Sequence, residues 1–286
     1  MNAAANNAPS EQVMDRASKL ADISTASFEQ QRSRRFASLI HKHQISEFMA
    51  AKLAQLEGMD IAILCDDSDS MQALCQESVL KAFPRRKTRW SELTHTVGII
   101  ADLSTVLDSD GVDVFFCNRD PILGITSHSA ELDAAFATPP EGDASLNRTL
   151  NSIIARHSKK HAAQPKSLLI IIATDGEPGP DINTEILEKT IRFGRASPSK
   201  IYITFVLCNH DPEKTSYLHE WDHDMEAVDV VDDFWSEQER ILSVQGPGFD
   251  FSKGDWVCKL LLGSVDRELD VVDEEKLVVN HVFAGY

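Results

Sequence analysis

Residues 59–71, MDIAILCDDSDSM, constrain the fold of this 286-residue chain more than any other stretch. Their apolar part predicts a buried β-strand, because a short apolar run that ends in turn-forming residues is typical of strands covered on both faces. Directly after it, the pattern Asp66-x-Ser68-x-Ser70 offers one carboxylate and two hydroxyls at alternating positions. These hard oxygen donors suit Mg²⁺, Mn²⁺ or Ca²⁺ better than a thiophilic metal. We therefore expect a strand that delivers metal ligands to one edge of a sheet.

A second stretch further along the chain has the same organisation. Residues 168–173, LLIIIA, predict another apolar strand, and the sequence Thr174-Asp175-Gly176-Glu177 follows it. If the two strands are neighbours in a sheet, the Asp175 carboxylate can reach the same cation as Asp66. The predicted metal ligands are therefore Asp66, Ser68, Ser70 and Asp175.

Helix capping is a simpler explanation of residues 66–70. Ser and Asp are preferred N-caps, so one of these side chains can close the start of a following helix, which we expect at residues 72–83. A cap needs a single oxygen, however, and does not account for five acids or serines in succession. The run as a whole favours a metal site.

The two loops resemble those of the von Willebrand factor A (vWA) family. In that family a metal-ion-dependent adhesion site joins an Asp-x-Ser-x-Ser loop to a later Thr-Asp-Gly loop, and both occur here in that order after apolar strands. The resemblance implies a divalent cation, Mg²⁺ or else Mn²⁺ or Ca²⁺, with one open position that an acidic side chain of a partner protein fills. The cation would offset the repulsion between the site's carboxylates and the incoming acid. This is recognition rather than turnover, so we expect no enzymatic activity.

A narrower resemblance rests on the segments VDVVDDF, QGPGF and GDWVCKLLLGSVD, together with RWSEL and DGVDVFFCNRD. They are similar to a branch of vWA proteins that occurs inside cells of fungi and other lower eukaryotes. That branch carries no known activity with it, and it implies a cytoplasmic protein.

Two positions depart from the family pattern. A third loop usually offers a Thr, but the corresponding residue here is Ala144, so that Ser145, Asp143 or a water molecule would have to take its place. The usual Gly between the two serines is Asp69, which adds negative charge close to the site. Both changes bear on the affinity and identity of the cation more than on the fold.

Apolar runs and helical periodicities alternate along the chain, which predicts an α/β fold with a doubly wound, mainly parallel, Rossmann-like sheet flanked by helices. Ligands of such sheets lie beyond the carboxyl ends of the strands, where the strand order reverses. We expect a helical extension in residues 1–57 whose first residues are disordered, a vWA-like domain in residues 58–265 and a C-terminal tail in residues 266–286. The extension contains Arg32, Arg34 and Arg35, which form either a binding patch or, in the reading we favour, a solvated face or an internal partner of the acidic domain.

Charge and composition limit the partners. The formal net charge of −17 argues against a nucleic acid or an anionic membrane, because both would be repelled. We also expect no membrane span and no signal peptide, because no apolar run reaches 18 residues and the segment MNAAANNAPSEQ has neither a basic nor an apolar region. Its five cysteines form no Cys-x-x-Cys pair and are expected to be free thiols in a reducing compartment.

Two other functions stay open. Residues 219–223, HEWDH, match the H-E-x-x-H pattern in which His219 and His223 would bind zinc and Glu220 would act as the base of a hydrolase. Against this, the segment is short, acidic and expected on a peripheral helix. Alternatively, the oxygen site is vestigial and the domain is a metal-independent scaffold.

Overall fold

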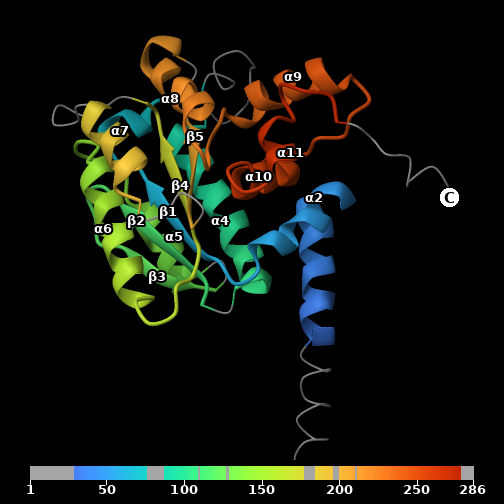
Figure 1. Ribbon diagram of the computed structural model, residues 1–286, viewed down its shortest axis with the longest axis horizontal. Coiled ribbons are helices and arrows are strands. Elements are labelled where there is room, and N and C mark those ends of the chain that lie inside the picture. The colour runs from blue at the N-terminus through green and yellow to red at the C-terminus, as the bar shows by residue number, and fades with distance from the viewer. Residues whose placement is uncertain are drawn as a thin grey trace, which may run out of the picture.

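The protein is described by a computed structural model that covers residues 29–75, 87–108, 110–126, 129–176, 184–195, 200–209 and 211–277. Its centre is a six-stranded sheet with the order β3-β2-β1-β4-β5-β6 (Figure 1). The strands are β1 (Asp60–Cys65), β2 (Val112–Phe116), β3 (Ile122–Ile125), β4 (Leu168–Thr174), β5 (Ile201–Leu207) and β6 (Val228–Val231). Strand β3 pairs antiparallel with β2, and the other neighbouring pairs are parallel. The predicted doubly wound, Rossmann-like α/β fold is confirmed.

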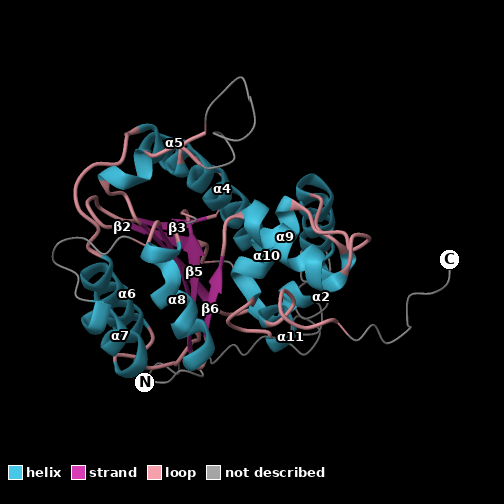
Figure 2. Cartoon of the chain, turned by 90° about the horizontal axis from the view of Figure 1, so that it is seen from above, coloured by secondary structure: helices cyan, strands magenta, loops and turns pink. Residues whose placement is uncertain are grey.

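Helices cover both faces of the sheet (Figure 2). One face packs against α4 (Arg89–Leu107), α5 (Ala130–Ala137) and α10 (Lys253–Leu262), and the other packs against α6 (Leu146–Lys160), α7 (Thr184–Phe193) and α8 (Pro212–Asp224). Successive side chains of a strand point to opposite faces, so β1 contributes Ile61 and Ile63 to the first layer and Ala62 and Leu64 to the second. This two-sided burial explains why the central strands are continuous apolar runs.

The N-terminal extension is helical as predicted and packs against the helices on the α4 side. Residues 29–43 form a helix, followed by α2 (Glu47–Lys52) and the 3-10 helix η1 (Leu53–Leu56). Met49, Leu53 and Leu56 are buried in the same cluster as α10. Arg32 donates from Nε to the Val106 carbonyl at 2.8 Å, which makes it an internal partner of the main domain. The predicted disorder of the first residues lies outside the described residues.

The C-terminal part continues the α4-side layer. It consists of α9 (Phe234–Gln245), α10 and the short α11 (Arg267–Asp270), and Leu269 and Val272 after the expected domain boundary are buried in the same cluster. A buried lysine, Lys259 of α10, joins this layer to Glu237 of α9 and Asp273 of the tail. Among the described helices, none combines the length and the apolarity that a bilayer span requires.

One predicted helix is wrong where the structure describes it. Residues 72–83 were expected to be helical, but the chain after Ser68 makes only the 3-10 helix η2 (Asp69–Gln72). The backbone of Ala73 and Cys75 then pairs with residues 87–89 through two hydrogen bonds of 2.9 Å. These bonds compete with helix formation and tie η2 to the start of α4. Residues 76–86 lie outside the described residues.

Candidate metal centre

The two predicted acidic loops lie side by side at the carboxyl edge of the sheet. Strands β1 and β4 are parallel neighbours with Cys65 opposite Ala173, so the residues that follow them emerge at the same level. The strand order reverses between β1 and β4, because β2 and β3 lie on one side and β5 and β6 on the other. This is the position at which doubly wound sheets bind their ligands. Asp66 and Asp175 are both fully buried there.

The carboxylate of Asp66 is held by two donors. Its Oδ1 accepts a hydrogen bond from the Ser68 backbone N–H at 3.0 Å, and its Oδ2 accepts one from the Thr174 hydroxyl at 3.0 Å. The second bond joins the two loops directly. Burial raises the pKa of Asp66, and the negative charge of Asp175 raises it further. A cation placed between these carboxylates would offset both effects.

The two serine hydroxyls have a spacing that suits a small cation. Ser68 Oγ and Ser70 Oγ are 3.0 Å apart. Neighbouring ligands of an octahedral Mg²⁺ ion at 2.0–2.1 Å are separated by about 3 Å. The hydroxyl pair therefore fits two adjacent coordination positions, and the whole donor set consists of oxygen atoms.

The loop of residues 141–145, which contains Ala144, contacts the loop of residues 66–70. The Glu141 N–H donates to the Asp67 carbonyl at 2.8 Å, and the Asp69 N–H donates to the Gly142 carbonyl at 3.0 Å. Ala144 is buried among the apolar residues on the α6 side. Ser145 precedes α6 without making a side-chain capping bond, so its hydroxyl is not used by the helix.

Asp67, which the sequence argument did not single out, fixes the loop geometry. Its Oδ1 accepts a hydrogen bond from the Asn118 N–H at 2.9 Å, and its Oδ2 lies 3.0 Å from Nε of Arg119. Arg119 also lies over the Trp90 ring at 5.1 Å from its centroid. Asp67 thus connects the loop of residues 66–70 to the residues that follow β2, although it is not one of the predicted ligands.

Arg89 is the residue of the site that sequence reasoning missed. Its Nη1 lies 2.6 Å from Asp175 Oδ2 and donates to the Ser70 carbonyl at 3.3 Å. The guanidinium therefore bridges the two acidic loops and supplies positive charge between them. The available signal was its place in the basic run of residues 85–89 in a strongly acidic chain.

A mostly apolar pocket adjoins Arg89 at the same edge of the sheet. Its lining also includes Cys208 after β5, Asp233 after β6, and Trp235 and Trp256 from α9 and α10. Lys253 lies over the Trp256 ring at 3.7 Å from its centroid and forms part of the wall. The oxygen donors and this pocket thus share one surface of the molecule.

The HEWDH segment forms part of α8, on the opposite layer. Glu220 and His223 are exposed, and His219 Nε2 lies 3.6 Å from Asp232 Oδ1. Burial lowers the pKa of His219. Within the described residues, the groups of three or more acids and histidines that could hold a metal do not include His219 or His223. The geometry gives the hydrolase alternative no support.

No family model matches this chain, and no curated protein sequence matches it.

Proposed function

We propose that the protein is a non-enzymatic, divalent-cation-dependent protein-binding module. Asp66 and Asp175 supply the negative charge, and Ser68 and Ser70 supply neutral oxygen ligands. The cation is Mg²⁺, or alternatively Mn²⁺ or Ca²⁺, because the donor set contains only hard oxygens. The observation that carries the proposal is that the loops with these four side chains follow two neighbouring parallel strands, β1 and β4, at the point where the strand order reverses.

The role of the cation follows from the charges. Two buried carboxylates repel a third, so an acidic side chain of a partner binds only when a cation lies between them. The partner's carboxylate completes the coordination shell. The apolar pocket next to Arg89 offers room for a neighbouring apolar side chain of the partner. Charge makes the interaction cation-dependent, and the pocket adds apolar contact.

A second candidate is a metal-independent scaffold, and one observation favours it. The Arg89 guanidinium already lies against Asp175 and supplies part of the charge that a cation would bring. If Arg89 replaces the cation, an acidic partner would bind to the guanidinium itself. Chelation would then leave the interaction intact.

Calorimetric titration of the full-length protein with Mg²⁺, Mn²⁺ and Ca²⁺ tests the proposal. We expect one cation to bind, and we expect Asp66→Asn to remove this binding. Asp69→Asn is the matched control, because Asp69 is an exposed acid of the same loop but not a predicted ligand, so this variant should at most weaken the binding and not remove it. Absence of binding by all three cations at millimolar concentration would leave the scaffold as the better explanation.

Partner capture separates the two candidates in a second way. Cation-dependent recognition is supported if the parent protein captures a partner that is lost when a chelator is added and that the Asp66→Asn variant does not capture. Partners retained in the chelator but lost on Arg89→Gln support the scaffold.

A further inference from the structure

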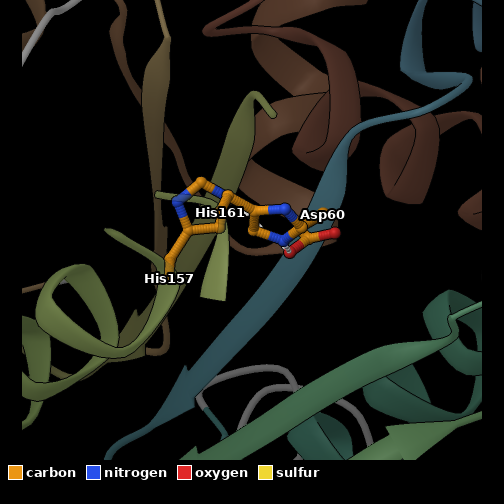
Figure 3. A group of neighbouring side chains, drawn as sticks. All are labelled: Asp60, His157 and His161. Atoms are coloured by element: carbon orange, nitrogen blue, oxygen red, sulfur yellow. Dashed lines mark hydrogen bonds and ion pairs between the residues drawn. The ribbon is translucent and has the colours of Figure 1, made fainter. Parts of the chain in front are cut away.

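At the end of the sheet away from Asp66, the side chains of Asp60, His157 and His161 form a group of residue types that could hold a metal ion (Figure 3). Asp60 is the first residue of β1, whereas Asp66 follows its last residue. His157 lies in the last turn of α6, and His161 is the residue that caps this helix. The two histidines are four positions apart, so one helical turn brings their rings to the same face.

The three side chains converge on one point. His161 Nε2 lies 2.7 Å from Asp60 Oδ2, and His157 Nε2 lies 3.6 Å from the same oxygen. The two rings have centroids 4.7 Å apart. Neighbouring ligands of a tetrahedral Zn²⁺ ion at 2.0–2.1 Å are about 3.3 Å apart, a value between the two observed distances. Small side-chain rotations would therefore complete the coordination.

His157 supplies the second, independent observation. The residue is only 9% exposed, and its Nε2 atom is buried without a hydrogen-bond partner in the part of the chain that the structure describes. A buried polar atom without a hydrogen-bond partner destabilises the folded state, so such atoms are rare in proteins unless they have another role. Here the unsatisfied nitrogen faces the Asp60 carboxylate, which is where a metal ion would lie.

The surrounding charges orient Asp60. Lys166 Nζ lies 2.6 Å from Asp60 Oδ1 and 2.8 Å from Asp108 Oδ2. The lysine therefore contacts one oxygen of the Asp60 carboxylate, and the other oxygen, Asp60 Oδ2, points toward the two imidazoles. Such contacts behind a ligand are typical of metal sites. Lys160 Nζ lies 3.3 Å from Oδ2 and would have to move. Its side chain is 45% exposed and also lies 3.5 Å from Asp110 Oδ2, which offers it another partner.

We propose that His157 Nε2, His161 Nε2 and Asp60 Oδ2 bind a zinc-class divalent ion. Two imidazoles and one carboxylate select Zn²⁺ or Co²⁺ over Mg²⁺, in contrast to the oxygen-only site at Asp66. Three protein ligands leave a fourth position open. A pocket lined by Asp60, His157 and Lys160 lies beside the group and gives water or an anionic ligand access to that position.

The ion would tie the C-terminal end of α6 to the start of β1. The site is chemically and spatially separate from the proposed adhesion site, so the two are testable independently. It also differs from the HEWDH pattern, whose histidines lie on α8.

Titration of the full-length protein with Zn²⁺ in excess Mg²⁺ tests the inference. We expect one Zn²⁺ ion to bind with micromolar or tighter affinity, and we expect His157→Ala/His161→Ala to remove the binding. His219→Ala/His223→Ala is the matched control and should retain it.

Two measurements on the unaltered protein guard against a variant that fails to fold. Substitution with Co²⁺ should give the visible absorption of a low-symmetry, nitrogen- and oxygen-ligated ion. Addition of Zn²⁺ should shift the imidazole nitrogen resonances of His157 and His161 and leave those of His219 and His223 unchanged. The inference is overturned if Zn²⁺ does not bind at micromolar concentration, or if its binding is lost in the α8 double variant instead.

Discussion

Arg89 Nη1 lies 2.6 Å from Asp175 Oδ2, and this ion pair connects the start of α4 to the loop after β4. The Asp175 side chain is fully buried, and the side chain of Arg89 is 14% exposed. A charge pair this well shielded from solvent interacts more strongly than a surface pair. Arg89 therefore controls both the stability of the site and its charge.

Substitution of Arg89 should strengthen cation binding. Arg89→Gln removes a positive charge next to the proposed ligands and frees Asp175 Oδ2, so we expect the affinity for Mg²⁺ or Mn²⁺ to rise by about 10-fold or more. In a chelator the same variant should melt at a lower temperature, because the buried Asp175 carboxylate loses its ion pair with Arg89. Calorimetric titration and thermal unfolding measure the two effects. Arg89→Lys, which keeps the charge, is the control and should bind the cation no more tightly than the parent.

The two carboxylates of the site should respond differently to neutralisation. Asp66→Asn keeps an oxygen that accepts the hydrogen bond from the Ser68 N–H. It also removes a buried carboxylate whose pKa is raised by burial. The cation-free form of this variant should therefore be at least as stable as the cation-free parent. Asp175→Asn leaves Arg89 without its charged partner and should be less stable by about 1–3 kcal/mol. Both variants should lose the rise in melting temperature that a cation gives the parent. Equal stability of the two cation-free variants would contradict the importance of the Arg89–Asp175 pair.

The elements that position the site could be predicted because their signals are local. Continuous apolar runs indicate strands buried on both faces, and β1 and β4 follow this rule closely. The acids directly after both runs then had to lie at one edge of a parallel sheet. The helix predicted at residues 72–83 is absent from residues 72–75, the part of that range that the structure describes. There Ala73 and Cys75 make backbone hydrogen bonds with residues 87–89, and local helix propensity gives no sign of these long-range bonds.

The contacts that tune both sites could not be predicted in the same way. Arg89 meets Asp175 across 86 positions of sequence, and His161 meets Asp60 across 101. Such pairs depend on where long side chains reach after the sheet and helices have packed. The basic run before α4 and the His-x-x-x-His spacing at the end of α6 were visible in the sequence, but nothing in the sequence identified their partners.

Lys259 should be among the most sensitive positions for stability. It is 1% exposed at the side chain, and its Nζ lies 2.6 Å from Glu237 Oε1 and 2.8 Å from Asp273 Oδ1. Lys259→Met would leave the buried Glu237 carboxylate without its cation, whereas Asp273 would keep its ion pair with Arg240 at 3.1 Å. We expect a cost of about 3–5 kcal/mol near neutral pH. Burial raises the pKa of Glu237 to about 7 even with the lysine present.

The decrease in the free energy of unfolding caused by Lys259→Met should therefore become smaller as the pH falls from 8 to 5. Glu237 takes up a proton over this range, and a neutral carboxyl group is not stabilised by the lysine charge. Chemical unfolding at several pH values measures this dependence. Lys42→Met is the control, because the Lys42 side chain is 59% exposed and its pair with Asp102 lies at the surface. It should change stability by no more than about 1 kcal/mol at any pH.

The last prediction concerns Asp229, which is 1% exposed in β6. Its carboxylate lies with those of Asp222 and Asp270 in one group whose oxygens are within 4.8 Å of one another. Burial raises the pKa of Asp229 well above its usual range, and burial together with the charge of Asp270 raises the pKa of Asp222 to about 7. Groups with raised pKa values bind more protons in the folded state than in the unfolded state. This part of the protein should therefore lose stability as the pH rises from about 4 to about 7.

Asp229→Asn should remove much of the stability loss that we expect as the pH rises. The amide has the same shape, so it fits beside Gly263, where an added Cβ would lie 1.7 Å from Asp229 Oδ2. Its NH₂ group can donate to a neighbouring carboxylate, whereas Asp229 Oδ2 has no hydrogen-bond partner among the described residues. We expect the variant to be about 1–3 kcal/mol more stable than the parent at pH 8, since one pKa unit corresponds to about 1.4 kcal/mol, and to match it near pH 4. Asp250→Asn, at an exposed acid, should show no such pH-dependent gain. If Asp229→Asn were instead less stable than the parent at pH 8, the Asp229 carboxylate would have to be ionised and stabilised by the positive charge of Lys259, which lowers the pKa of Asp229 and so opposes the effect of burial.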